Sequence, residues 1–170
     1  MPALLCAALL GGVVYWSLRS SEPAGGPAGR LPGDVLDGAL AAQVPAGDPL
    51  AGFGEARVAL GDRCMRIAVA DEPGERVQGL RGVTDLGAYD GMLFVFPTDG
   101  RGAFTMAGTP RELDIGFYDA GGREVDRERM TPCPEGDDAS CPLYESRARY
   151  RYALETAAGG LGSGVLSACG

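Results

Sequence analysis

The sequence predicts a mainly β domain, a small barrel or sandwich with one short helix, preceded by an N-terminal membrane helix. Apolar and polar residues alternate over several short segments between residues 54 and 162, and Gly, Pro and Asp separate these segments. Residues 2–18 form an uncharged, mostly apolar run. We therefore divide the chain into a transmembrane anchor or signal segment (1–18), a flexible linker (19–53), a compact β domain (54–162) and a tail (163–170).

The N-terminal run has two interpretations, a retained anchor and a cleaved signal peptide, because about 17 residues is the lower limit for a spanning helix. It ends in Tyr15 and Trp16, residue types common at membrane interfaces, and no small-x-small cleavage pair closely follows, which favours the anchor. Arg19 directly after the run would hold the domain in the cytoplasm by the positive-inside rule. The cysteines favour export, so we expect a single-pass membrane protein whose domain lies outside the cytoplasm, or a secreted protein if the segment is cleaved.

The linker is rich in Gly, Ala, Pro and Ser, with one apolar patch at residues 35–44 that is long enough for a helical turn or two. Within the domain, Glu72 followed by Pro73 predicts the start of a short helix with Val77 and Leu80 on one apolar face. Five segments are predicted strands: a half-buried one at 64–70, one buried on both faces at 92–96, one at 113–117, a charged edge strand at 123–130 and a last strand at 149–155.

The composition excludes several classes of function. The chain has no His, so a Ser-His or Cys-His pair and an imidazole metal site are both excluded, and we expect no cofactor and no metal. A net charge of -8 argues against nucleic acid as a partner, because such binding requires an excess of basic residues.

Cys133 and Cys141 flank a polar loop, and we predict a disulfide between them, which requires an oxidising compartment. Two Cys at this spacing without a His or a second pair make a poor zinc site. Cys64 and Cys169 remain open: either they pair with each other, or the first is a buried thiol and the second an exposed one.

Five segments occur in an order and spacing that resembles a known family: GERVQGLRG at 74–82, GMLFVF at 91–96, FTMAGTP at 104–110, LDIGFYDAGG at 113–122 and YALE at 152–155. They are similar to the domain-of-unknown-function 192 family, small mainly β proteins often found behind an export signal. The resemblance covers roughly residues 54–162. It implies a fold and no biochemical activity.

The family pattern falls mostly on apolar residues and Gly, which core packing and turns explain. The positions that the resemblance leaves as candidates for ligand binding are Arg76, Phe104, Met106, Thr109, Asp114 and Glu155. Thr105 stands where the family usually has Trp, and Arg81 where it usually has an apolar residue, which weakens the expected aromatic surface for a flat ligand.

We therefore expect non-catalytic binding of a small ligand, a glycan or an envelope protein, by a domain tethered to the membrane through residues 2–18. The alternative is a hydrolytic enzyme with Asp114 and Glu155 as an acid/base pair, a chemistry that needs no His. A structural accessory to a membrane complex is a third interpretation.

Overall fold

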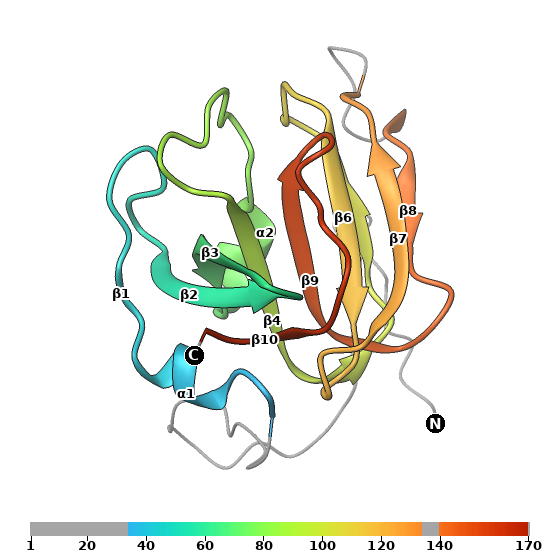
Figure 1. Cartoon of the computed structure of the whole chain (residues 1–170). Helices are drawn as coiled ribbons and strands as arrows, with labels where there is room; N and C mark the ends of the chain where they lie inside the picture. Colours follow the sequence, from blue (N-terminus) through green and yellow to red (C-terminus); the bar gives the residue numbers. More distant parts are fainter. Residues whose placement is uncertain (1–33, 134–139, 170) are drawn as a thin grey trace, which may run out of the picture.

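The computed structural model describes residues 34–133 and 140–169, and in this part of the chain eight strands form one open sheet (Figure 1). The strand order is β1-β2-β3-β4-β9-β6-β7, and β10 pairs with β2. The strands of this sheet are β1 (Val44–Pro45), β2 (Gly54–Leu60), β3 (Arg63–Ala70), β4 (Gly91–Gly100), β6 (Leu113–Tyr118), β7 (Glu124–Met130), β9 (Tyr150–Ala157) and β10 (Leu166–Ala168). The predicted mainly β class is confirmed, but the predicted barrel is wrong, since β1 and β7 do not close the sheet.

A second, two-stranded sheet is made by β5 (Ala103–Thr105) and β8 (Leu143–Glu145). Helix α1 covers Asp37–Ala41 and helix α2 covers Pro73–Gln78. In Figure 1, α2 lies behind β4, whereas α1 lies below the sheet next to β10. The described chain therefore has one short helix beyond the single one predicted.

Helix α2 begins where the sequence predicts. Pro73 is the first helical residue, and the Glu75 carboxylate accepts hydrogen bonds from the backbone N–H of Glu72 at 3.1 Å and of Asp71 at 3.0 Å. The helix ends at Gly79, whose φ of +47° strongly favours glycine. This turn carries Leu80 into the core, but Val77 stays 76% exposed, so the predicted apolar pair is wrong for Val77.

Strand β9 is the centre of the sheet, with β4 on one side and β6 on the other, both antiparallel to it. Tyr150 to Thr156 are all buried, so the strand predicted at 149–155 lies inside the sheet, and a further strand, β10, follows it in the chain. The apolar residues Tyr150, Tyr152 and Leu154 alternate in the sequence, but they do not all lie on one face of the strand. The register between β4 and β9 shifts between Tyr150 and Tyr152, and these two side chains pack in different hydrophobic clusters.

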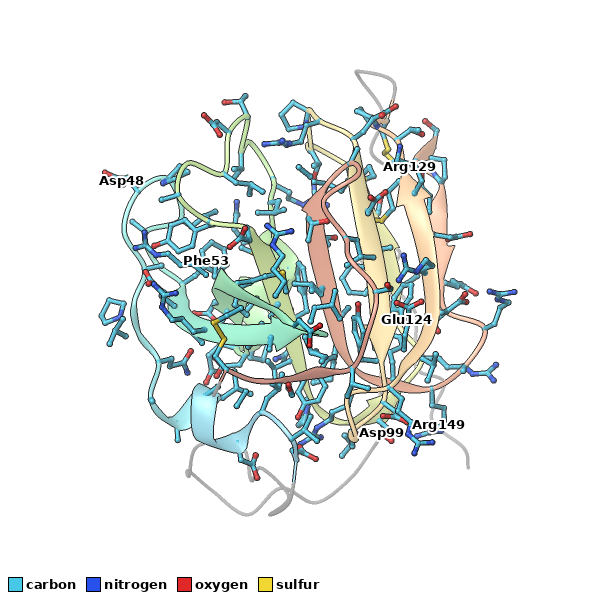
Figure 2. The ribbon with its side chains drawn as sticks, viewed as in Figure 1. Asp48, Phe53, Asp99, Glu124, Arg129 and Arg149 are labelled. Atoms are coloured by element: carbon cyan, nitrogen blue, oxygen red, sulfur yellow. A yellow bond between two sulfur atoms is a disulfide. The ribbon has the colours of Figure 1, made fainter. Side chains whose placement is uncertain are left out.

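The sheet carries one hydrophobic cluster on each face. Met65, Ile67 and Val69 pack together in one cluster, and Ala68 and Ala70 belong to the other, which confirms the period-two prediction for residues 64–70. The strand predicted at 92–96 lies within β4, and its first four residues are buried. The segment predicted as a charged edge strand is β7, at the end of the sheet; Figure 2 shows Glu124 and Arg129 along it.

Residues 34–53, assigned to the flexible linker, are part of the domain. Leu36, Leu40 and Leu50 are buried and anchor this segment to the domain. The composition does not reveal this, because three apolar side chains are enough to anchor so short a segment and the rest of it is rich in Gly and Pro. The Asp34 carboxylate also forms an ion pair with Arg151 of β9, with 2.6 Å between Oδ2 and Nη2, and both side chains are at least nine-tenths buried. The boundary predicted at residue 53 therefore lies too late.

The predicted tail is likewise attached to the sheet. Leu166 is fully buried, β10 pairs with β2, and Cys169 forms a disulfide with Cys64 on β3. The disulfide predicted between Cys133 and Cys141 is confirmed. Across residues 34–133 and 140–169, no helix has the length and apolarity needed to cross a membrane; the predicted membrane segment, 2–18, lies outside the described residues.

The two disulfides close loops of very different length, 105 and 8 residues in sequence separation, so they should stabilise the fold unequally. Loop-closure entropy predicts a loss of about 4.7 kcal/mol in the free energy of unfolding for the double variant Cys64→Ser/Cys169→Ser, and about 2.5 kcal/mol for Cys133→Ser/Cys141→Ser. Urea denaturation of both variants measures the two losses. An equal loss, or a larger one for the short loop, would contradict the tethering of β10 as the structure shows it.

Candidate functional site

A cavity of about 440 Å³ opens between α2, β4, β5 and β9. Its volume lies in the range typical of small-molecule sites. The wall is partly aromatic and partly polar, and it is made by Pro73, Arg76, Val77, Gln78, Gly79, Leu80, Arg81, Phe94, Phe96, Gly102, Ala103, Phe104, Thr105, Thr109, Tyr150 and Glu155.

Glu155 is the most unusual residue of this wall. It lies near the end of β9, opposite Met92 of β4 and Ile115 of β6, and only 5% of it is exposed. No hydrogen bond or ion pair joins its carboxyl to any residue of the described chain. Burial alone raises the pKa of Glu155 to about 8, so this acid is mostly protonated at neutral pH. A buried carboxyl without a partner is costly, and such groups are concentrated at functional sites.

Close packing of β4 and β9 fixes the backbone of Glu155. A Cβ at Gly91, the first residue of β4, would lie 2.1 Å from the backbone oxygen of Glu155, so only glycine fits there. The same approach occurs at the end of α2, where a Cβ at Gly79 would lie 3.3 Å from the ring of Phe94. Both glycines belong to the segments that carry the family resemblance.

Arg76 of α2 brings a positive charge to the cavity. Its Nη1 donates hydrogen bonds to the backbone oxygens of Asp71 and Val95, the latter at 2.9 Å, and its guanidinium lies 5.5 Å from the ring centroid of Phe96. Burial lowers the pKa of Arg76, although acidic residues at the start of α2 act in the opposite direction. Arg76 remains charged, yet it forms no ion pair with a residue that the structure describes.

Four aromatic rings line the cavity in mutual contact. Phe104 lies edge to face against Phe94, with ring centroids 5.1 Å apart, and Phe96 lies in the same way against Tyr150 at 5.3 Å. The Tyr150 hydroxyl donates to the backbone oxygen of Gly102 at 3.0 Å and accepts from its N–H at 3.2 Å. Burial raises the pKa of Tyr150 to about 12, so this phenol stays neutral.

The sheet β5–β8 supports one side of the cavity. Phe104 and Thr105 lie on β5, and Phe104 is opposite Tyr144 of β8. The Tyr144 hydroxyl accepts a hydrogen bond from the N–H of Thr131, just after β7, and the Cys133–Cys141 disulfide closes the connection between β7 and β8. The disulfide therefore helps to hold the strand on which Phe104 depends.

The structure brings four of the six predicted site residues to the cavity, namely Arg76, Phe104, Thr109 and Glu155. Met106 is buried in the hydrophobic cluster on the same side of the sheet and does not line the cavity.

Asp114 lies on the opposite face. It is opposite Thr156 in the sheet, whereas Glu155 is opposite Ile115, so the two acids point to different sides. Asp114 accepts hydrogen bonds from Arg129 (Figure 2) at 2.5 Å and from the N–H of Gly159 at 2.6 Å. Burial tends to raise the pKa of Asp114, but these hydrogen bonds outweigh it and lower the pKa. The predicted acid/base pair of Asp114 and Glu155 is therefore wrong.

Three rings of the cavity wall, Phe94, Phe96 and Tyr150, are not among the site residues predicted from the sequence. Phe94 and Phe96 are two residues apart in one strand, and this spacing places both on the face that carries Phe104. No comparable signal existed for Tyr150, because the register shift in β9 sets its orientation. The expected weakening of the aromatic surface by Thr105 is offset by these rings.

A second hollow of about 670 Å³ lies on the other side of the turn after α2. It is bordered by Asp48 and Phe53 (Figure 2) and shares Gln78, Gly79 and Arg81 with the first cavity. It has no counterpart of Glu155, a buried acid without a partner. No group of three or more acidic, Cys or His side chains is placed to hold a metal within residues 34–133 and 140–169.

The raised pKa of Glu155 predicts an unusual dependence of stability on pH. Between about pH 4.5 and pH 8, the folded chain keeps a proton that the unfolded chain has released. The free energy of unfolding should therefore fall as the pH rises through this interval, by about 5 kcal/mol in total, and this loss should level off above pH 8.

The variant Glu155→Gln isolates this contribution, because an amide of the same shape cannot ionise. Urea denaturation of both proteins at a series of pH values measures the difference, which should grow in favour of Glu155→Gln toward pH 8. Glu128→Gln, at an exposed position of β7, is the control and should show no such trend. If the free energy of unfolding depended on pH in the same way for Glu155→Gln and the unmodified chain, Glu155 would not be a buried carboxyl without a partner.

Two solved structures share the fold: a protein of unknown function from Novosphingobium aromaticivorans DSM 12444 (TM-score 0.60, 22% identity, 74% of this chain and 94% of the other covered) and a protein titled as a candidate transcription regulator from Sinorhizobium meliloti 1021 (TM-score 0.58, 23% identity, 68% and 94% covered). At these identities the likeness shows the fold alone. No curated protein matches the chain.

The family comparison is more informative, because it covers most of the domain. The model of the domain-of-unknown-function 192 family, whose description is an uncharacterized ACR, matches residues 56–165. This range contains α2, the paired strands β4 and β9, and every residue that lines the cavity. The chain therefore belongs to the domain-of-unknown-function 192 family.

Proposed function

We propose that this domain binds a small ligand without catalysis, in the cavity between α2, β4, β5 and β9. The observation that carries the proposal is the carboxyl of Glu155, which is buried without a partner and faces an open, aromatic-lined space. A folded protein gains nothing in stability from such a group, whereas a ligand that bonds to it gains specificity. Arg76 offers a second polar contact at the same cavity.

The chemistry around Glu155 favours binding over turnover. Acid/base catalysis of hydrolysis commonly needs two groups whose pKa values differ, and Asp114 lies on the other face of the sheet. Among the hydroxyls of the wall, that of Tyr150 bonds Gly102, and that of Thr105 accepts a hydrogen bond from the N–H of Ala107 at 3.3 Å. The raised pKa of Glu155 keeps one alternative worth testing, in which this acid alone transfers a proton to or from a bound substrate.

We further propose that the domain works at the cell envelope, outside the cytoplasm, and that residues 2–18 anchor it there. Two disulfides support this location, because such bonds persist in oxidising compartments. The apolar run and its aromatic end support the anchor. The ligand would then be a small envelope molecule or an accessible part of a glycan or protein, reached by a domain that begins within about 20 residues of the membrane segment.

Ligand-observed saturation-transfer NMR tests the binding proposal. The full chain, kept in a non-ionic detergent, is screened with neutral monosaccharides, sugar acids, amino acids and aromatic carboxylates. We expect signals from at least one class, and we expect Phe104→Ala to reduce them at least tenfold because it removes a ring from the cavity wall. Leu143→Ala, which removes an exposed side chain of β8 outside the cavity, is the matched control and should leave the signals unchanged.

The same samples distinguish binding from catalysis. After a day of incubation, the spectra should show the added compounds unaltered. Product signals that appear with the unmodified chain and vanish with Glu155→Gln would replace the binding proposal with an enzymatic one. Binding signals that persist in Phe104→Ala would place the ligand outside the cavity.

A further inference from the structure

We propose that the ligand of this cavity is a small zwitterion, with a positively charged amine set against Glu155 and the aromatic rings and a carboxylate held by Arg76. This inference rests on the proposed binding function and names its ligand class. Three independent features of the wall carry it: the unpartnered acid, the ring cluster and the unpaired guanidinium.

The unpartnered acid points to a cationic partner. Within the described residues, no side chain and no backbone group donates to the Glu155 carboxyl, and the chain contains no Lys that could reach it. A buried carboxyl can remain protonated or be paired with a cation, and the second state requires the charge to come from the ligand. A ligand ammonium group, methylated or not, would bring the positive charge that this carboxyl lacks.

The rings strengthen this preference. Phe94, Phe96, Phe104 and Tyr150 line the same cavity as Glu155. Three of their contacts are nearly at right angles, and the contact between Phe104 and Tyr150 is tilted at 42°. Aromatic faces carry negative charge, so cations bind against them, and quaternary ammonium groups are recognised in this way. A carboxyl combined with aromatic walls therefore suits an amine or its methylated form better than a neutral hydroxyl.

Arg76 supplies the opposite end. Its Nη1 is occupied by two backbone oxygens, whereas the edge formed by Nε and Nη2 makes no hydrogen bond with the described residues. This edge offers two parallel N–H groups, the geometry that binds a carboxylate in a bidentate manner. Asp71, Glu72 and Glu75 lie nearby, which favours a singly charged carboxylate over a dianionic phosphate.

The other residues of the cavity wall leave the preference of Glu155 for a cationic ligand group unchanged. Among the described residues of the cavity wall, Arg76 and Arg81 are the only charged side chains besides Glu155, and Tyr150 stays neutral. The strand partners of Glu155, Met92 on β4 and Ile115 on β6, do not titrate. Arg76 and Glu155 do not pair with each other, so each remains available to one end of a ligand.

Calorimetric titration of the full chain in a non-ionic detergent tests the proposal. The probes are trimethylammonium carboxylates with one to five methylene groups between the charges, a series that scans the distance between the two ends. Each is paired with a tert-butyl carboxylate of the same length, in which carbon replaces nitrogen. We expect at least one ammonium compound to bind roughly 30-fold more tightly than its uncharged counterpart.

Proton release gives a second readout. Free Glu155 is mostly protonated at pH 7, and a bound cation should drive it to ionise. Titrations in two buffers of different ionisation enthalpy should therefore show release of about one proton per bound ammonium compound at pH 7 and almost none at pH 9.5. The tert-butyl compounds should release none.

Variants assign the two ends. Glu155→Gln should reduce the binding of the ammonium compound to that of its tert-butyl counterpart, and Arg76→Lys, which keeps the charge but loses the paired N–H groups, should weaken both about tenfold. Glu128→Gln and Arg123→Gln are exposed controls that should change neither.

The proposal that the ligand is a zwitterion would be overturned if none of the ammonium compounds bound. It would also be overturned if both members of every pair bound equally. Such a result would leave the binding function standing if another compound still bound to the unmodified chain and was lost in Phe104→Ala.

Discussion

The double-sided burial of strand β9 is the constraint on which the rest of the structure depends. Its backbone pairs with β4 and β6, and its side chains supply both hydrophobic clusters, with Tyr152 and Leu154 on one face and Tyr150 and Ala153 on the other. A slip of one residue would exchange the two faces. The same pairing that holds the core together therefore decides that Glu155 faces the cavity.

That placement has a thermodynamic cost, and this cost is the basis of the proposed binding function. Above its pKa, an unpartnered Glu155 destabilises the fold, and below its pKa it occupies a position that an apolar residue would fill more favourably. The surrounding structure offsets this cost with two disulfides, a buried ion pair between Asp34 and Arg151, and two aromatic contacts of Phe104. The Cys64–Cys169 disulfide and the Asp34–Arg151 ion pair supply stability away from the cavity, whereas Phe104 supplies it from the cavity wall itself.

Local patterns predicted the local structure well, because alternation in residues 64–70 and the Glu72-Pro73 pair each depend on neighbouring residues only. What could not be predicted depends on distant pairing. The ion pair between Asp34 and Arg151 joins residues far apart in the sequence, and it incorporates a segment whose composition is typical of a linker. The cavity also depends on distant pairing: Arg76, Asp114 and Glu155 are all candidates from the sequence, but only the register of β6 and β9 shows that Glu155 lines the same cavity as Arg76 and that Asp114 does not.

The Glu155 carboxyl lies buried in the cavity without a partner among residues 34–133 and 140–169. The most direct test is a ¹³C NMR titration of the glutamate side-chain carboxyl carbons in the full chain, with the Glu155 signal assigned by its absence in Glu155→Gln. We expect a midpoint at about pH 8 for this one signal. A midpoint at or below the ordinary glutamate value of 4.5 would show that the carboxyl is solvated or paired. Glu155 would then not be a buried acid without a partner.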